Sequence, residues 1–364
     1  MQNNPIRVGG VGVGGIFTGV HMPNMLKSSD MVLAAVCDND PEKLFRAREL
    51  YGISEDRCFT DFRDLVNCPD VDAVDICTSN DVHHPVTMAA IEAGKPYLLE
   101  KPVALNATLA EEMALRTEEK KLANMVCFSY RFRPAARFAR DLVLQGAIGE
   151  VHHVYMQYLF GFASNRSLAW RCIKERAGSG LVSDLGSHSI DLARFITGRE
   201  FVRVAGHLGT CVKEARYLDG SGWGKVETDD YANILAEMDG GTSVSYQITA
   251  NARGRFNYQR MDILGSKGAI IYSQNTGERR RDATNGFDDT DKIEVSIGEP
   301  YMSTFTYSEL PVPQQYFSNQ MQSFADIVNN CGDGLAASIE DGFIAQKVID
   351  KIIEADAGRM WLDI

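Results

Sequence analysis

Asp184 and His188 are the pair of side chains with the clearest capacity for chemistry. They stand four residues apart at the start of an expected helix, and this spacing places both on one face of it. An imidazole has an ordinary pKa near 6.5, so His188 can accept or return a proton close to neutral pH. Such a group suits a reaction in which a hydroxyl gives up its proton while its carbon gives up a hydride. Two plainer interpretations stay open, in which Asp184 caps the helix and His188 is a partly buried structural residue.

The glycine-rich segment RVGGVGVGGI near the N-terminus ends a strand-like apolar run. Glycines there let the backbone turn tightly and let a pyrophosphate approach, and the helix that follows directs free N–H groups at the phosphates. The pattern G-x-G-x-x-G fits in two registers. One uses Gly10, Gly12 and Gly15, and the other uses Gly12 and Gly14 with Phe17 at the third position.

Asp38 stands where a dinucleotide-binding fold carries the acid that holds the ribose. It follows the second apolar run, 23 residues beyond Gly15, and this separation is close to the ~20 residues expected. A carboxylate there accepts hydrogen bonds from the ribose and repels a 2′-phosphate, which favours NAD over NADP. Asp38 could instead do no more than open the turn at residues 38–41.

The first 130 residues alternate short apolar runs with amphipathic stretches, which predicts a parallel sheet with right-handed crossovers and helices on both faces. Strands are expected at 6–11, 31–37, 71–77, 97–99 and 124–129, and helices at 41–51, 85–93 and 108–122.

Strand-like runs dominate after about residue 150, and Asp239-Gly240-Gly241 joins two of them as a tight hairpin. They lie at 151–160, 201–212, 231–238, 242–250, 260–264 and 269–273, with helices around 184–196, 317–329 and 339–356. The expected fold is α/β, an N-terminal Rossmann parallel sheet in domain 1–130. An α+β domain with a large, mostly antiparallel, open-faced sheet follows in 131–364.

More specific motifs are spread along the whole chain. They are Thr78-Ser79-Asn80 with His83, AGKPYLLEKP at 93–102, RFRP at 131–134, GAIGEV at 146–151, GSGLVSDLGSHSID at 178–191, ILGSKGA at 263–269 and SIEDG at 338–342. Together they resemble the Gfo/Idh/MocA oxidoreductases, which are marked by a T-P-N-like turn, an E-K-P motif and a D-x-G-x-H motif.

The resemblance implies an NAD-dependent dehydrogenase that acts on a sugar, an inositol or a related polyol. It places Lys101 at the nicotinamide end of the cofactor, in one catalytic centre with Asp184 and His188. It also implies a homodimer or homotetramer. The cofactor contacts it implies are Gly12, Val13, Gly14, Gly15, Ile16, Asp38, Thr78, Asn80, His83, Glu100 and Lys101. Arg131, Trp170 and Arg171 are candidates for contact with the substrate, and packing is an equal alternative for the tryptophan and its neighbour.

The chain departs from the family pattern at a few positions. Phe17 takes a place usually held by a small residue, Ser79 replaces a proline and Ser179 interrupts a glycine triplet, whereas His21 matches. None of these changes removes a chemical group. Asp191 could support the catalytic histidine from the next helical turn or form a salt bridge instead.

Two other functions fit the same resemblance. Some relatives cleave glycosidic bonds by transient oxidation with bound NAD, and a sugar- or nucleotide-sensing regulator can use the same fold without turnover. Retention of both Lys101 and His188 weighs against the regulator. Net formation of NADH separates the dehydrogenase from the hydrolase.

Composition excludes several other classes. A formal net charge of −12 disfavours a nucleic-acid partner, and the short basic run at 279–281 is expected to be a solvated loop. Eight cysteines without a C-x-x-C pair indicate reduced thiols, and the adjacent histidine pairs at 83–84 and 152–153 give no metal signature. With no apolar run long enough to span a bilayer and no signal peptide, we expect no membrane association and a cytoplasmic protein.

Overall fold

The computed structural model describes residues 4–163, 167–218, 220–275, 291–297 and 306–364. The chain forms two compact units. The N-terminal unit is Met1–Phe128 with Ser318–Ile344, and the C-terminal unit is Ser129–Phe317 with Ala345–Ile364. The chain therefore passes to the second unit close to residue 130 and returns to the first near its end. The basic run at 279–281 lies outside the described residues.

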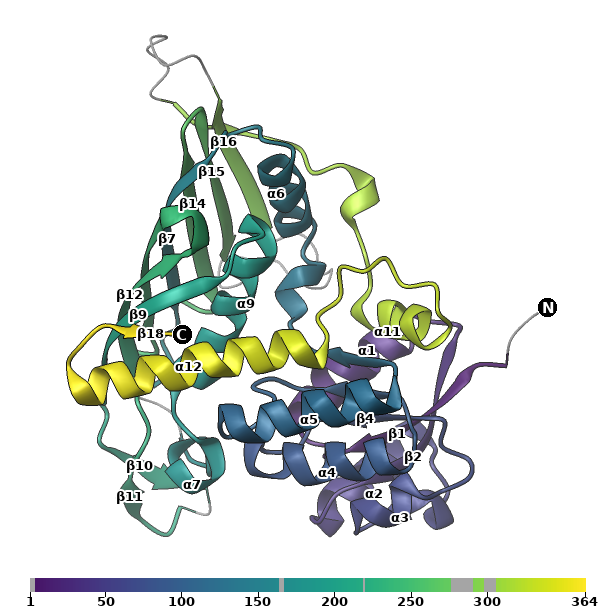
Figure 1. Cartoon of the computed structure of the whole chain (residues 1–364). Coiled ribbons are helices and arrows are strands. Elements are labelled where there is room, and N and C mark those ends of the chain that lie inside the picture. The colour runs from purple at the N-terminus through teal and green to yellow at the C-terminus, as the bar shows by residue number, and fades with distance from the viewer. Residues whose placement is uncertain (1–3, 164–166, 219, 276–290, 298–305) are drawn as a thin grey trace. The chain divides into compact units, whose positions relative to one another are not determined.

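A parallel sheet with strand order β3-β2-β1-β4-β5-β6 forms the centre of the N-terminal unit (Figure 1). Its strands are β1 Ile6–Val11, β2 Met31–Cys37, β3 Cys58–Phe59, β4 Ala73–Ile76, β5 Tyr97–Leu99 and β6 Asn124–Val126. All the strand pairs are parallel. Because the order reverses between β1 and β4, a crevice is expected outside the carboxyl ends of these two strands.

Helices of the N-terminal unit begin and end at residues suited to those positions. Asp40 caps α2 by accepting the N–H of Glu42, and Gly52 ends that helix in the left-handed conformation. The helical segments of this unit are η1 Phe17–His21, α1 Met22–Met25, α2 Pro41–Tyr51, η2 Glu55–Arg57, α3 Phe62–Val66, α4 Asn80–Glu92, α5 Ala107–Lys120 and α11 Gln320–Val328. Helix α12 Ile339–Gly358 starts in this unit and continues into the other.

Helix α4 begins earlier than the sequence predicts. The prediction starts a helix at Pro85, whereas α4 starts at Asn80 after Ser79 and contains the proline. Pro85 is the sixth residue of α4 and lies inside the helix, where it removes one backbone hydrogen bond to the preceding turn. The extra turn brings Asn80 and His83 onto the helix.

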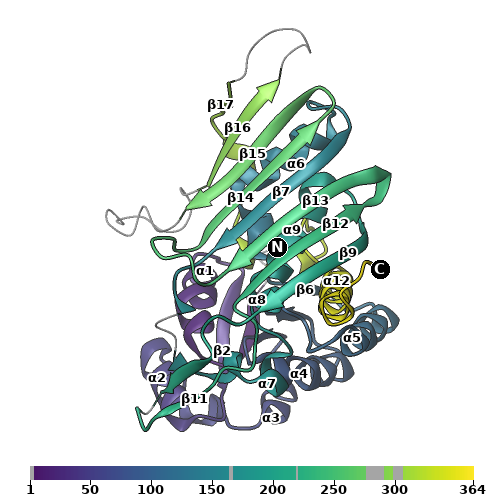
Figure 2. The ribbon, with the colours of Figure 1, turned by 90° about the vertical axis from the view of Figure 1, so that its left-hand side faces the viewer.

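The C-terminal unit is built on a mixed sheet of nine described strands in the order β17-β16-β15-β14-β7-β13-β12-β9-β18 (Figure 2). Only the β7–β13 pair is parallel. The strands are β7 Val151–Leu159, β9 Phe201–Gly209, β12 Tyr231–Met238, β13 Thr242–Thr249, β14 Tyr258–Gly265, β15 Gly268–Asn275, β16 Asp291–Ile297, β17 Ser308–Glu309 and β18 Leu362–Asp363. The predicted hairpin at Asp239-Gly240-Gly241 joins β12 to β13.

Helices cover one face of this sheet. They include α6 Pro134–Leu144, α8 Leu181–Asp184 and α9 Gly186–Thr197, and η3 Ser129–Phe132 precedes them. All residues of α9 are buried. Seen from the other side, the strands lie in front and no described helix of this unit crosses them (Figure 2). The fold therefore matches the expected open-faced sheet.

A small sheet that the sequence did not reveal adjoins the glycine-containing loop of the C-terminal unit. It has the order β11-β10-β8, from Trp223–Lys225, Glu214–Tyr217 and Ser167–Leu168. Its core is limited to Cys172, Ala215 and Val226 with Leu168 packed against them. Short strands with exposed alternate residues carry too little apolar pattern to be recognised in the sequence.

A buried ion pair joins η3 to α9. The Nε of Arg131 donates to Oδ2 of Asp191 at 2.9 Å, and both side chains are buried. Thus Asp191 forms a salt bridge, the second of the two roles left open for it. An ion pair at this depth fixes the geometry of the two elements that it joins more than it adds to stability.

Replacing one member of this pair should lower the free energy of unfolding far more than replacing both. Arg131→Met leaves the Asp191 carboxylate buried without its counter-ion, so the free energy of unfolding should fall by about 3–5 kcal/mol. The double variant Arg131→Met/Asp191→Leu should recover much of that loss in urea titrations. Arg116→Met, which breaks a half-exposed pair with Glu92, should change the free energy by less than about 1 kcal/mol. Additive losses in the double variant would contradict this interpretation.

Candidate active site

Residues expected to hold a nucleotide gather at the carboxyl edge of the parallel sheet. Backbone hydrogen bonds join Gly12 N–H to the Cys37 carbonyl and Cys77 N–H to the Val11 carbonyl, both at 2.8 Å. The Glu100 N–H continues the ladder to the Ile76 carbonyl at 2.9 Å. The glycine turn, Asp38, Thr78 and Glu100 are thus held at the ends of neighbouring strands of one unit.

The structure decides between the two registers of the glycine motif. Gly10 lies inside β1, and a Cβ there would stand 2.4 Å from the ring of Phe17. Gly12 has φ +85°, and a Cβ on it would stand 2.7 Å from the carbonyl of Cys77. Gly10 therefore makes room for the unusual Phe17, whereas Gly12 makes the turn. The register is Gly12, Gly14 and Phe17.

The following glycines leave a space of the kind that a pyrophosphate needs. A Cβ placed on Gly14 or Gly15 would meet no heavy atom within 4 Å. Val13 is buried and anchors the turn, and Ile16 is 40% exposed at the start of the helix. A bare backbone that faces open space beside a helix N-terminus suits NAD, because the N–H groups and the dipole attract phosphate.

Asp38 takes the turn-ordering role that was left open for it. Its Oδ1 accepts the N–H of Asp40 at 3.0 Å, so the side chain does order the turn into α2. Lys43 reaches the same oxygen at 3.6 Å. The carboxylate nonetheless stays at the end of β2, where a ribose would approach.

His83 links the turn after β4 to the E-K-P segment. Its Nδ1 lies 2.8 Å from the carbonyl of Pro102, and its Nε2 lies 3.3 Å from the carbonyl of Thr78. Burial lowers the pKa of His83, although the adjacent carbonyls and Glu100 oppose this effect. His83 thus lies between the two segments, and in its neutral form it can donate to only one of the two carbonyls. The Lys101–Pro102 peptide is cis.

Glu100 joins two hydrogen-bonding groups of the same unit. Its Oε1 lies 2.9 Å from Nε2 of His21, and its Oε2 accepts the backbone N–H of Lys101 at 3.2 Å. The other ring nitrogen of His21 lies 2.9 Å from Oδ1 of Asp75. Sequence reasoning missed Asp75, although a carboxylate in the buried strand run VDAVDIC was a usable signal.

Asp184 and His188 lie in the C-terminal unit, on either side of a junction between two helices. Asp184 is the last residue of α8, and Leu185 keeps a right-handed helical backbone before α9 begins at Gly186. The expected four-residue spacing therefore runs through an almost continuous helix. Asp184 is not the N-cap of α9, so the plainer capping interpretation is wrong.

Asp229 fixes the start of α8. Its two carboxylate oxygens accept the N–H groups of Gly180 at 2.6 Å and Val182 at 2.9 Å. A Cβ on Gly180 would overlap the carbonyl of Asp229, so this position requires glycine. The Ser179 hydroxyl bonds that of Ser183, which shows how the serine is accommodated in the glycine loop. Sequence reasoning did not single out Asp229.

Tyr130 packs on the ring of His188 within the C-terminal unit, and Tyr158 lies next to Tyr130. The ring of Tyr130 packs edge-to-face on the imidazole with centroids 4.7 Å apart. The hydroxyls of Tyr130 and Tyr158 lie 2.6 Å apart, and both donate to Oδ1 of Asn257. Burial raises the pKa of Tyr158 well above its ordinary value, and Tyr130 and Asp184 add to this effect. Sequence reasoning missed this cluster.

The three residues considered for substrate contact have different surroundings. Arg171 is half exposed, stacks on Trp170 at 4.3 Å and brings its Nε within 3.6 Å of Oδ2 of Asp184. Arg131 is buried in its ion pair with Asp191. We therefore keep Trp170 and Arg171 as substrate candidates and assign Arg131 a structural role.

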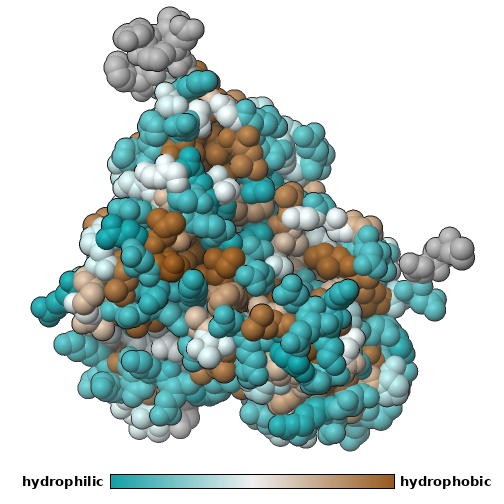
Figure 3. Space-filling view, viewed as in Figure 1, coloured by the Kyte–Doolittle hydropathy of each residue, from teal (hydrophilic) through white to brown (hydrophobic). Residues whose placement is uncertain are grey.

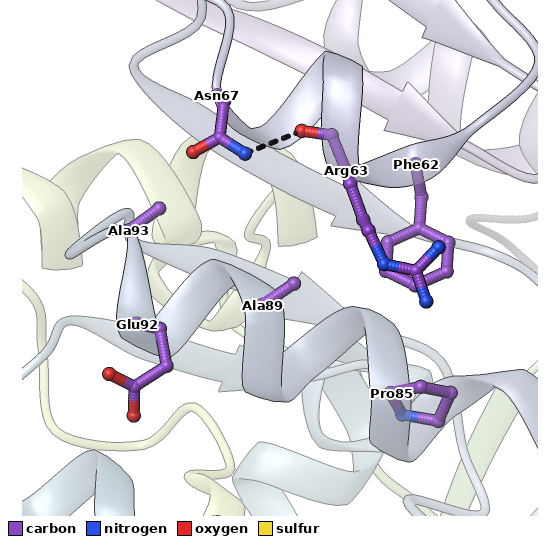
Figure 4. Close-up of a pocket in the computed structure, with 7 residues that line it drawn as sticks. All are labelled: Phe62, Arg63, Asn67, Pro85, Ala89, Glu92 and Ala93. Atoms are coloured by element: carbon purple, nitrogen blue, oxygen red, sulfur yellow. Dashed lines mark hydrogen bonds between the residues drawn. The ribbon is translucent and has the colours of Figure 1, made fainter.

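A groove between α3 and α4 lies elsewhere in the N-terminal unit (Figure 4). It is lined by Phe62, Arg63, Asn67, Pro85, Ala89, Glu92 and Ala93. The side-chain amide of Asn67 donates a hydrogen bond to the backbone carbonyl of Arg63, and the Arg63 guanidinium stacks on Phe62. None of the expected cofactor residues lines it.

Comparison with known proteins identifies the class. Residues 6–128 match the oxidoreductase family with an NAD-binding Rossmann fold, and residues 136–271 match the GFO/IDH/MocA C-terminal domain. The chain belongs to the GFO/IDH/MocA oxidoreductases. No described helix has the length and apolar character that a membrane crossing requires.

Similar proteins are known over nearly the full chain. Levoglucosan dehydrogenase of Pseudarthrobacter phenanthrenivorans is 29% identical over 92% of this chain and 90% of its own. Inositol 2-dehydrogenase of Rhizobium meliloti is 26% identical over 99% of both chains. A solved levoglucosan dehydrogenase in complex with NADH and levoglucosan superposes with a TM-score of 0.84, at 27% identity, covering 99% of this chain and 100% of that one.

Glycine substitutions should separate folding from cofactor binding. Gly14→Ala adds a methyl to open space, so the melting temperature should hold while the dissociation constant for NAD rises by about tenfold or more. Gly12→Ala should lower both stability and affinity, because its φ and the Cys77 carbonyl oppose a side chain. Gly19→Ala, which also faces open space but lies one helical turn further on, should change neither. Calorimetric titration would contradict the assignment if Gly14→Ala bound NAD like the parent.

Proposed function

We propose that the protein is an NAD-dependent dehydrogenase that removes a hydride from a hydroxyl-bearing carbon of a cyclic sugar, an inositol or a related polyol. The observation that carries this proposal is the Gly12–Gly15 cradle in a chain similar over its length to sugar and inositol dehydrogenases. Bound NAD would supply the hydride acceptor.

The protein's own groups would handle the proton and orient the substrate. His188 takes the hydroxyl proton in the direction of oxidation, and Asp184 assists it from the neighbouring turn. Lys101 donates a hydrogen bond to the reacting oxygen and stabilises the charge that develops there. Trp170 and Arg171 contact other hydroxyls of the ring.

The test is a screen for NADH formation by purified protein. Levoglucosan, myo-inositol, D-glucosides and sugar acids are incubated with NAD, and absorbance of NADH is recorded while the products are separated by chromatography. Net NADH with an oxidised product supports the dehydrogenase. Cleavage of a glucoside without net NADH, or no conversion of any compound, would count against it.

Lys101 and His188 should behave as one catalytic unit. Lys101→Ala and His188→Ala should each lower turnover by at least about 100-fold, the lower bound for a general acid–base group, while NAD stays bound. The turnover of the double variant should be little lower than that of the less active single variant, because the effects of groups that act together are not additive. His152→Ala, at an exposed histidine of β7, is the matched control. Near-parental turnover in His188→Ala would move the base elsewhere.

We also propose that the enzyme is a homodimer or homotetramer joined through the open face of its large sheet. Strand register places Leu235, Ser245, Tyr155 and Asp262 in one row across β12, β13, β7 and β14. Leu235 is 53% exposed and Tyr155 is 49% exposed. On the face shown in Figure 3, by comparison, apolar residues form separate patches among hydrophilic ones. An aromatic and an aliphatic side chain amid polar groups suit a protein interface.

A charge in the middle of that row should break the assembly. Leu235→Glu would bury carboxylates against a second copy, so light scattering at micromolar concentration should show a lower mass than for the parent. Leu50→Glu, at a leucine of α2 that is 67% exposed, should leave the mass unchanged. A monomeric mass for the parent chain would rule the proposal out.

The thiols support a reducing, cytoplasmic location, which we include in the proposal. All eight cysteines are free, and Cys37, Cys68, Cys127 and Cys172 are buried. Free thiols persist where disulfides do not form. Detection of the protein in an exported fraction of its source cells would contradict this location.

A further inference from the structure

A histidine in the core of the N-terminal unit lies between two carboxylates, one at each ring nitrogen. His21 has no exposed surface, its Nδ1 lies 2.9 and 3.0 Å from the two oxygens of Asp75, and its Nε2 lies 2.9 Å from Oε1 of Glu100. The exposed fractions of the two acidic side chains are 0% and 15%. Ionised carboxylates only accept hydrogen bonds, so both ring nitrogens must donate. A neutral imidazole has one N–H, and an imidazolium has two.

The surroundings set the charge of this ring. Burial alone would lower the pKa of His21, but the Asp75 carboxylate outweighs burial and raises it well above its ordinary value. The groups that face the ring come from each element around it. Asp75 and Cys77 belong to the β4 segment, Glu100 follows β5, Cys127 follows β6, and on the far side of Glu100 lie Lys101 and His83 of α4.

A metal ion is the other reading of this cluster. His21 forms one potential ligand set with Asp75 and Cys77 and another with Glu100 and Cys127. Two ligand atoms on a tetrahedral zinc, each at about 2.0–2.1 Å, stand roughly 3.3 Å apart, which is wider than the 2.9 Å nitrogen–oxygen spacing here. Zinc would also need thiolates, whereas burial raises the pKa of Cys77 well above its ordinary value. The spacing and the thiols favour a shared proton over a metal.

The network ends at the residue expected to meet the reacting oxygen. While one oxygen of Glu100 binds the ring, the other accepts the backbone N–H of Lys101 at 3.2 Å. His21 itself ends the π-helical turn that follows the glycine cradle. One ring thus connects the segment that would hold the pyrophosphate to the segment that would act at the nicotinamide.

We propose that His21 is an imidazolium throughout the working pH range and is a positioning residue, which holds Glu100 and through it the Lys101 backbone in the geometry needed for hydride transfer. The second half of this inference rests on the proposed function. The first half concerns charge alone and has its own measurement.

The charge of the His21 ring is tested by measuring how the unfolding equilibrium depends on pH. A histidine whose folded pKa is raised stabilises the fold fully below the ordinary value near 6.5, and this stabilisation is lost as pH rises towards the folded pKa. Relative to His21→Gln, the unfolding equilibrium constant of the parent should therefore rise about tenfold for each pH unit above roughly pH 7. His84→Gln removes a histidine that pairs with Glu112 nearer the surface and should keep the parental slope. Equal slopes in the parent and His21→Gln would overturn the charged ring.

Asp75→Asn keeps the test decisive if His21→Gln does not fold. It removes the carboxylate that contributes most to the raised pKa of His21, while the amide can donate to a neutral ring nitrogen and Glu100 still accepts the Lys101 N–H. The steep slope should then flatten. Zinc bound at about one ion per chain in the parent and lost in His21→Gln would overturn the proposal in favour of a metal site.

The positioning role of His21 is tested by comparing the effect of a substitution on kcat with its effect on the dissociation constant for NAD. His21→Gln should lower kcat by at least about tenfold, because a small misplacement of Lys101 is costly, while the dissociation constant for NAD stays within about threefold. His84→Gln should match the parent in both. If His21→Gln has the kcat of the parent, the positioning role is overturned. If the parent itself is inactive, the proposed function is contradicted, and the charge of His21 is then decided by the pH dependence of unfolding alone.

Discussion

The contact between the backbone of Gly12 and the carbonyl of Cys77 is the constraint on which the N-terminal unit depends. Because β1 and β4 are neighbours, the chain that leaves β1 has to turn across the end of β4 with no room for a side chain. This turn sets the start of the helical segment that carries His21. The same course of the chain places His21 between Asp75 and Glu100. The glycine cradle and the buried charge network are therefore one construction.

Each unit places a buried ion pair beside a residue with an expected chemical role. In the N-terminal unit the network ends at Lys101, and in the C-terminal unit the pair of Arg131 and Asp191 flanks both Tyr130 and His188 along the chain. Burying charges costs more than their attraction returns, so such pairs are poor sources of stability. What they do supply is a single geometry, because a buried charge has few alternative partners.

Continuous apolar runs made much of the fold predictable. The predicted bounds of β1, β2, β5 and β12 agree with the structure because each strand is a short apolar or alternating run that ends in a turn. β3 has two residues, and α3 has five, so neither builds up a readable period. Helix α6 was also missed, although its buried residues Ala135, Ala139 and Val143 recur every four positions.

The candidate site was predictable only where a motif is local in the sequence. The glycine turn, Asp38 and the spacing of Asp184 and His188 each lie within a few residues of a recognisable pattern. His21 and Asp75 are 54 residues apart and meet only in the folded sheet. Arg131 shows the converse, because a residue inside a family motif turned out to be paired in the core. A sequence pattern gives the type of a side chain but not its partner.

Among the described strands, the outermost one at each edge of the large sheet has only two residues. β17 and β18 each add one short strand to an outer edge, and each ends in an acidic residue, Glu309 and Asp363. Each of them pairs with only two residues of the longer strand beside it. Short edge strands that carry charge are poor templates for pairing with another chain, so edge-to-edge growth is disfavoured rather than excluded. In the proposed assembly the open faces meet instead, and an arrangement in which the same patch meets itself about a twofold axis closes after two copies.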